Sequence, residues 1–346
     1  YLAACPRHLA HRAVFEVNKH TKLFLYYLWD NYHMTYAFVF PGQGSQAVGM
    51  GQELAAAFPA AAEVFEVIDD ALGENLTKTM FEGPENVLML TENAQPALMA
   101  VSLAVLSVLR KEGGFDLRSK VRYVAGHSLG EYSALAAAGT FSLSDTAKLL
   151  KTRGRAMQEA VPVGKGAMAA ILGLNLDIVR KIADEAAQGE ICTSANDNAN
   201  GQVVISGTKT AVERALLLAK DKGAKRGVQL PVSAPFHCAL MAPASDAMAE
   251  ALSLVRMKDP LVPLVANVTA GEVSDAAEIR RLLVEQVTGM VRWRESVLFM
   301  RANGVDRLIE IGSGKVLSGL ARRIDSDLTS QSISTPEDVE TFIKSF

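Results

Sequence analysis

Short apolar runs alternate with longer amphipathic stretches along most of the chain. The apolar runs have the length of buried strands: 35–40, 121–125, 261–267 and 307–311. The amphipathic stretches have the spacing of helices: 52–72, 96–110, 144–160, 243–256 and 293–303. Pro96 suits the first turn of the second of these helices. Strands that alternate with helices are typical of a parallel sheet covered on both faces, so the pattern predicts an α/β fold.

The pattern changes between residues 163 and 231, where shorter elements follow one another closely. They are expected in the order strand, helix, strand, strand, helix, strand: 167–172, 177–188, 191–194, 202–206, 210–222 and 224–231. This βαββαβ order is that of a ferredoxin-like unit. We therefore expect a small ferredoxin-like subdomain at 163–231, inserted into a large α/β subdomain made of 34–162 and 232–346.

Residues 1–33 show no clean period, and Met34 directly precedes the first predicted strand. We expect this segment to be a leader or an N-terminal extension outside the catalytic fold. Its apolar run, 23–29, is too short to span a bilayer.

Composition narrows the classes of function. With 49% hydrophobic and 21% charged residues the chain can bury a sizeable core, and a net charge of −3 gives no nucleic-acid footprint. Cys5, Cys192 and Cys238 have no paired spacing, which argues against a disulfide framework or a zinc site and fits a reducing compartment. We expect a cytoplasmic monomer that binds no metal, membrane or nucleic acid.

The segment Gly126-His127-Ser128-Leu129-Gly130 lies between an apolar run and the Ala-rich stretch 134–139. A strand, a tight turn with one serine and a helix directly behind it form a nucleophile elbow, as in α/β-hydrolases. The start of that helix favours negative charge beside the serine oxygen. The pattern predicts that Ser128 is a nucleophile and that the large subdomain is α/β-hydrolase-like.

A serine nucleophile needs a base to take its proton. Of the six histidines, four lie in residues 1–33, and His127 points away from Ser128 because neighbours across a tight turn diverge. His237, where the chain leaves the small subdomain, is the base expected by elimination. Three candidate acids between Ser128 and His237 fall within the helices and loops of the small subdomain: Asp177, Asp184 and Asp197. A backbone carbonyl is therefore the alternative group to orient the imidazole.

Four segments in order and spacing resemble the malonyl-CoA:acyl carrier protein transacylase family of bacterial fatty-acid synthesis. They are Pro41-Gly42-Gln43-Gly44-Ser45-Gln46, Gly126 to Tyr132, Thr152-Arg153-Gly154, and Phe236-His237 with Leu240-Met241. The resemblance covers the chain from about Met34 to its C-terminus. One departure is Ser313, where the family usually has proline, away from the expected chemistry.

The resemblance implies a ping-pong transfer through a malonyl ester on Ser128, from malonyl-CoA to the phosphopantetheine thiol of acyl carrier protein, which supplies fatty-acid elongation. It implies proton transfer by His237, an oxyanion hole from the N–H groups of Gln43 and Leu129, and a backbone carbonyl of Gln286 that orients His237. No cofactor is bound permanently, and the coenzyme A thioester is the substrate.

The resemblance also assigns the free malonyl carboxylate to Arg153. Physical chemistry agrees, because a guanidinium offers two parallel donors to a planar carboxylate. Phe236 resembles the malonyl-selecting form of its position, and Asn198 is a further candidate for the cleft. Basic residues suggested for docking of the carrier protein are Lys225, Arg226, Lys315 and Arg322.

Two other hypotheses use the same residues. A serine esterase or thioesterase would release malonate to water and would not need a carrier protein. A carrier-docking module with an inactive elbow would keep its function without Ser128. Loading of the protein from malonyl-CoA discriminates among the three.

Overall fold

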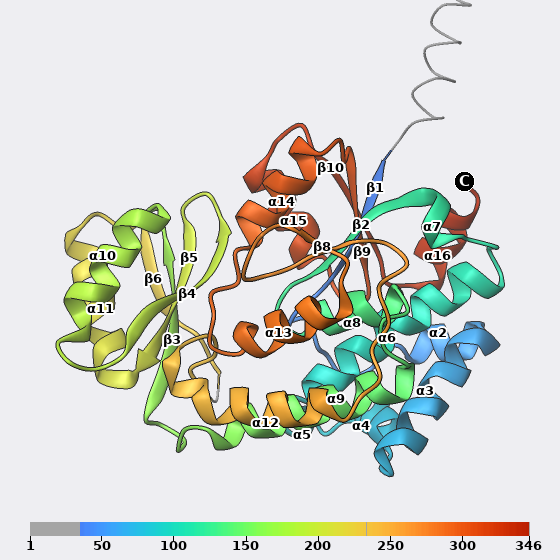
Figure 1. The fold of residues 1–346 in the computed structure, drawn as a ribbon, viewed down its shortest axis with the longest axis horizontal. Helices are drawn as coiled ribbons and strands as arrows, with labels where there is room; N and C mark the ends of the chain where they lie inside the picture. Colours follow the sequence, from blue (N-terminus) through green and yellow to red (C-terminus); the bar gives the residue numbers. More distant parts are fainter. Residues whose placement is uncertain (1–34, 233, 346) are drawn as a thin grey trace, which may run out of the picture.

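Two β-sheets organise the fold of this computed structural model, which describes residues 35–232 and 234–345 (Figure 1). The larger sheet has the strand order β10-β9-β1-β2-β7-β8, and every neighbouring pair is parallel except β7 with β8. Its strands are β1 (Tyr36–Phe40), β2 (Val121–Gly126), β7 (Leu264–Val265), β8 (Glu272–Val273), β9 (Arg307–Ile311) and β10 (Thr329–Ile333). The predicted α/β fold with a parallel sheet core is confirmed. The predicted leader, residues 1–33, lies outside the described residues.

Helices cover both faces of the larger sheet. Phe38 and Phe40 of β1 pack in one apolar cluster with α6, α8 and α9, while the alternate residues Ala37 and Val39 pack in another with α14 and α15. The helices around this sheet are α2 (Gln52–Ala57), α3 (Pro59–Leu72), α4 (Leu76–Glu82), α5 (Glu85–Leu88), α6 (Thr91–Lys111), α7 (Leu117–Lys120), α8 (Gly130–Ala137), α9 (Leu143–Glu159), α12 (Ala242–Ser253), α13 (Ala276–Gln286), α14 (Trp293–Ala302), α15 (Val316–Ile324) and α16 (Pro336–Ile343). Side chains that alternate along a strand thus reach two separate cores.

Three predicted elements differ from the observed ones. The helix expected at 52–72 is two helices, because Phe58 is extended (φ −132°, ψ 116°) before Pro59, and a residue that precedes proline disfavours helical geometry. Helix α6 begins at Thr91, so Pro96 lies inside it and not in its first turn. The strand expected over 261–267 is only Leu264–Val265.

The smaller sheet has the strand order β4-β5-β3-β6, with each neighbouring pair antiparallel. Its elements follow the predicted order of types: β3 (Gly166–Leu172), α10 (Leu176–Ala187), β4 (Cys192–Ala199), β5 (Gln202–Thr208), α11 (Lys209–Asp221) and β6 (Arg226–Gln229). Both helices pack on the sheet in one apolar cluster. Strand β4 extends beyond the strand expected at 191–194. It also contains Asn196, Asp197 and Asn198, which were expected in the loop after that strand.

Strand β4 also ties the smaller sheet to the rest of the chain. Val291 exchanges main-chain hydrogen bonds with it, donating to Ala195 O and accepting from Asp197 N, both at 2.9 Å. The buried Asp197 carboxylate lies 2.8 Å from Nη2 of Arg294 at the start of α14. A buried carboxylate is stable only when it is paired and hydrogen-bonded. This ion pair therefore fixes the position of β4 relative to the start of α14.

Helix α6 is the one helix among the described residues that is long and apolar enough to cross a membrane, and 83% of its apolar window is buried inside the protein. Such burial is typical of a core helix. It packs against α3 and α9 in the main apolar cluster.

A close contact between the start of α8 and the end of β1 makes a test of the fold. A Cβ on Gly130 would lie 2.2 Å from the carbonyl oxygen of Phe40. Overpacking a core costs about 1–3 kcal/mol or more, so Gly130→Ala should lower the free energy of unfolding by roughly 3 kcal/mol, measured by urea denaturation.

The matched control for that variant is Gly319→Ala, in the exposed part of α15. No heavy atom outside its own helix backbone and chain neighbours lies within 4 Å of the Cβ position there, counting the described part of the chain. A helical Gly→Ala replacement gains about 0.5–1 kcal/mol. Similar changes in the two variants would contradict the steric role of Gly130.

Candidate active site

Ser128 occupies a strained turn between β2 and α8. Its φ of 54° is left-handed, and the flanking glycines are required because a Cβ on Gly126 would lie 1.9 Å from the carbonyl of Gly130. The buried Asn267 braces the turn: its Oδ1 accepts from Ser128 N–H at 2.8 Å, and its Nδ2 donates to Gly126 O at 2.6 Å. The elbow predicted from the sequence is present in this geometry.

His237 lies directly beside the serine. Its Nε2 is 2.8 Å from Ser128 Oγ, and its Nδ1 is 2.9 Å from Gln286 O and 3.1 Å from Gly289 O. Carbonyl oxygens only accept, so Nδ1 carries the proton and Nε2 presents its lone pair to the serine hydroxyl. Burial, with the positive charge of Arg153, lowers the pKa of His237 to about 3. The imidazole is therefore neutral at pH 7 and can accept a proton.

Two main-chain N–H groups face the same space. Gln43 follows β1 and Leu129 precedes α8, and both line the cavity that contains Ser128. Within the described ranges neither N–H has a hydrogen-bond partner. Unpaired donors beside a nucleophile are suited to an oxyanion.

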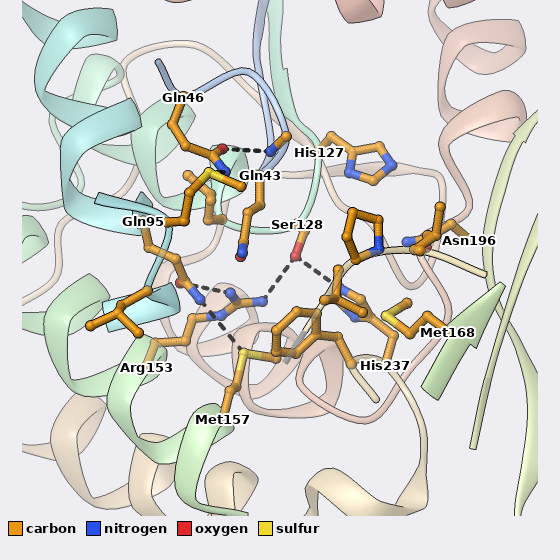
Figure 2. A pocket seen from close by; sticks show the side chains of 18 of the residues that line it. Gln43, Gln46, Gln95, His127, Ser128, Arg153, Met157, Met168, Asn196 and His237 are labelled. Atoms are coloured by element: carbon orange, nitrogen blue, oxygen red, sulfur yellow. Dashed lines mark hydrogen bonds between the residues drawn. The ribbon is translucent and has the colours of Figure 1, made fainter. Parts of the chain in front are cut away.

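Arg153 reaches the nucleophile from α9 and is almost fully buried, with 1% of its surface exposed. Its Nη1 donates to Gln95 Oε1 at 2.8 Å, and its Nη2 donates to Gln286 Oε1 at 2.8 Å and to Ser128 Oγ at 3.1 Å. Figure 2 shows Ser128 between Arg153 and His237. A buried guanidinium this close to the serine favours an acyl group that carries its own negative charge.

A second buried charged group lies behind the elbow. Glu131, in the first turn of α8, accepts from Gln286 Nε2 at 2.7 Å and from Asn267 N–H at 3.3 Å. Burial raises the pKa of Glu131 to about 7, against the opposing effect of these hydrogen bonds and of Arg153. Gln286 Nε2 also donates to Ser128 O at 2.9 Å. The elbow, the base and the guanidinium thus share one hydrogen-bonded network.

The cavity above these groups has a volume of about 530 Å³. Its apolar wall comes from several elements: Met157 lies on α9, Met168 on β3, and Leu230, Val232 and Phe236 in the segment after β6. Figure 2 shows Met157 and Met168 on the side of Arg153 and His237, with Gln43 and Gln46 across the serine. An apolar wall around a few convergent polar groups is typical of a small-molecule site.

Most predicted site residues line this cavity, and Gln286 and Asn198 do not. The Oδ1 of Asn198 lies 2.8 Å from Nε2 of the partly buried His127, which does line the cavity, as does Asn196. The basic residues suggested for carrier docking are absent from the lining too.

Three residues of the network are not predicted from the sequence: Gln95, Glu131 and Asn267. A glutamine inside an apolar helix was a usable signal for Gln95, and Glu131 belonged to the quoted motif. Nothing local distinguished Asn267.

Comparison with known proteins gives a consistent result. Residues 37–331 match the family model described as the acyl transferase domain. The malonyl CoA-acyl carrier protein transacylase of Bacillus subtilis (strain 168) is 45% identical over 309 residues, which cover 89% of this chain and 96% of that protein.

Solved structures agree with this match. The acyl-carrier-protein-S-malonyltransferase of Bartonella henselae has a TM-score of 0.88 and 57% identity, covering 90% of this chain and 99% of that one. A malonyl-transacylase in complex with its type II PKS acyl-carrier protein has a TM-score of 0.87 and 43% identity, covering 90% and 100%.

The low pKa of His237 predicts the pH dependence of the nucleophile. Because the base form persists as the pH falls, the reaction of Ser128 with a neutral fluorophosphonate should show no inflection near 6.5, the ordinary histidine pKa. The rate is measured from about pH 8 to about pH 5. Glu131→Gln is measured in parallel, because Glu131 has a pKa of about 7 in the same network. A loss of rate centred near 6.5 in both proteins would contradict a neutral, buried base.

Proposed function

Because the chain belongs to the acyl transferase family, we propose that it transfers malonyl from malonyl-CoA to the phosphopantetheine thiol of acyl carrier protein, for fatty-acid elongation. Its relatives are named as malonyl transferases that act on acyl carrier protein, and one is solved with its carrier. The observation that carries the proposal is the meeting of a nucleophile, a neutral base and a buried guanidinium in one cavity: Ser128, His237 and Arg153.

In the first half-reaction, Ser128 Oγ attacks the thioester carbonyl and His237 Nε2 takes the hydroxyl proton. The negative charge that develops on the carbonyl oxygen is stabilised by the N–H groups of Gln43 and Leu129. The carbon–sulfur bond then breaks, and the proton on Nε2 goes to the departing coenzyme A thiolate. Malonyl is left as an ester on Ser128.

The second half-reaction reverses these roles. The phosphopantetheine thiol gives its proton to His237 Nε2 and its sulfur attacks the ester carbonyl, with the same two N–H groups on the oxyanion. Ser128 Oγ leaves and recovers the proton. Hydrogen bonds from Nδ1 to the carbonyls of Gln286 and Gly289 hold the ring through both steps and stabilise the imidazolium.

Arg153 selects the malonyl group. One N–H of Nη1 is held by Gln95 and one of Nη2 by Gln286, which leaves an N–H on each nitrogen for a carboxylate. The carboxylate replaces the bond from Nη2 to Ser128 Oγ and frees the nucleophile. An acetyl group has no carboxylate to bind the guanidinium. Phe236 in the cavity wall restricts a branched acyl chain.

The finer architecture belongs to the same proposal. We assign 34–162 and 232–346 to an α/β-hydrolase-like subdomain and 163–231 to a ferredoxin-like one, with the acyl site between them. Both parts contribute to the cavity, since Met168 and Asn196 come from the smaller sheet. Asn198 acts indirectly by holding His127. The proposed enzyme is a cytoplasmic monomer that needs no resident cofactor.

Covalent loading tests the reaction. Incubation with radiolabelled malonyl-CoA should place label on Ser128, and holo acyl carrier protein should then remove it as malonyl thioester. Ser128→Ala should take up no label. Labelled free malonate as the sole product would overturn the transferase and favour the esterase or thioesterase hypothesis.

Selectivity tests Arg153. A hydrogen bond to a charged group contributes about 1.5–3 kcal/mol, so Arg153→Ala should lower kcat/KM for malonyl-CoA by roughly 100-fold. Acetyl loading should fall far less. The matched control is Arg155→Ala, on the same helix, whose side chain is exposed and paired with Glu92. Equal losses for malonyl and acetyl would contradict the carboxylate-binding role.

A further inference from the structure

Gln286 is the point at which the parts of the site meet. Its main-chain oxygen holds His237 Nδ1, its side-chain oxygen holds Arg153, and its side-chain nitrogen donates to Ser128 O. The residue is fully buried at the end of α13. The orientation of its carboxamide therefore decides which atom faces the guanidinium.

Glu131 fixes that orientation. The nearest acceptors of the Gln286 amide nitrogen are Glu131 Oε2 at 2.7 Å and Ser128 O at 2.9 Å, with Asn267 Oδ1 more distant at 3.3 Å. The amide oxygen is left to accept from Arg153 Nη2 at 2.8 Å. A flipped amide would set its oxygen against two acceptors and its N–H groups against the guanidinium, so the observed orientation is strongly favoured.

The base does not depend on this contact. His237 is held by the main-chain oxygens of Gln286 and Gly289, which stay in place when the Gln286 amide turns. Loss of the Glu131 carboxyl should thus disturb Arg153 more than the pair of Ser128 and His237, because neither the hydrogen bond between these two nor those of His237 Nδ1 involve the carboxyl or the amide. Protonation of Glu131 also leaves an oxygen that can accept from the amide.

We propose that Glu131 is a positioning residue for acyl selectivity: through the Gln286 amide it holds Arg153 where the substrate carboxylate binds. This inference rests on the proposed malonyl transfer and concerns the same site. It distinguishes two tasks of the network, since Glu131 serves recognition of the carboxylate more than activation of the nucleophile.

The test compares two acyl donors in variants of Glu131. In Glu131→Leu the amide loses an acceptor, and kcat/KM for loading Ser128 from malonyl-CoA should fall roughly 10- to 100-fold, mostly through KM. Loading from acetyl-CoA should change less than about threefold. Glu131→Gln keeps an acceptor oxygen at the position and should restore the malonyl-to-acetyl ratio to within about threefold of the parent.

Controls separate selectivity from folding. Ser133→Ala changes a buried residue of the same helix whose hydroxyl has no hydrogen bond within the described residues, and it should keep the parent ratio. Reaction of Ser128 with a fluorophosphonate reports an intact elbow in every variant. If Glu131→Leu does not fold, Glu131→Asp replaces it, because the shorter side chain withdraws the carboxyl and should lower the same ratio.

The outcomes are distinct. Equal losses for malonyl and acetyl, or an unchanged ratio in a folded Glu131→Leu protein, would overturn the positioning role. Failure of Glu131→Gln to restore the ratio would also count against it. Failure of the parent protein to take up malonyl would instead overturn the proposed function.

Discussion

The arrangement of the site depends on one buried amide, that of Gln286. Base, nucleophile turn and guanidinium come from distant parts of the sequence, and each makes a hydrogen bond to this residue. Buried polar groups must find partners, because an unpaired one costs about 1–3 kcal/mol. Each hydrogen bond made by Gln286 thus also fixes the position of a neighbouring residue. The network can form only when the end of α13 lies beside the Ser128 turn.

The charges in this network explain why the site suits an anionic acyl group better than a neutral one. Arg153 is buried and positive, His237 is neutral, and Glu131 has a pKa near 7, so its charge is only partly developed. The guanidinium therefore has incomplete compensation from the protein alone. A substrate carboxylate supplies the missing charge in a space from which most water is excluded, and selectivity follows from the cost of leaving a buried cation without a partner.

Much of this was accessible from the sequence, and the reasons differ by residue. The elbow at Ser128 is a local pattern of strand, glycines and helix, so periodicity and turn chemistry sufficed. His237 followed from elimination, whereas Gln43, Leu129, Gln286 and Arg153 were assigned through a family resemblance. Nothing in the sequence near Asn267 indicates its role, because its contact with Ser128 spans 139 residues. Gln95 differs, since a glutamine inside an apolar helix is itself a local signal. The break at Phe58 was missed although Pro59 signals it, because apolar periodicity continues through both helices.

The pairing of β1 with β2 has a consequence for the two N–H donors of the proposed oxyanion hole. Phe40 is the register partner of Gly126, and Gln43 and Leu129 follow these residues at the same interval of three. Neighbouring strands lie about 4.8 Å apart in nearly every sheet. The hydrogen-bonded sheet therefore sets the distance between the two N–H groups, between which the carbonyl oxygen must fit. The spacing of these two N–H groups is therefore set by main-chain geometry and does not depend on which side chains the two strands carry.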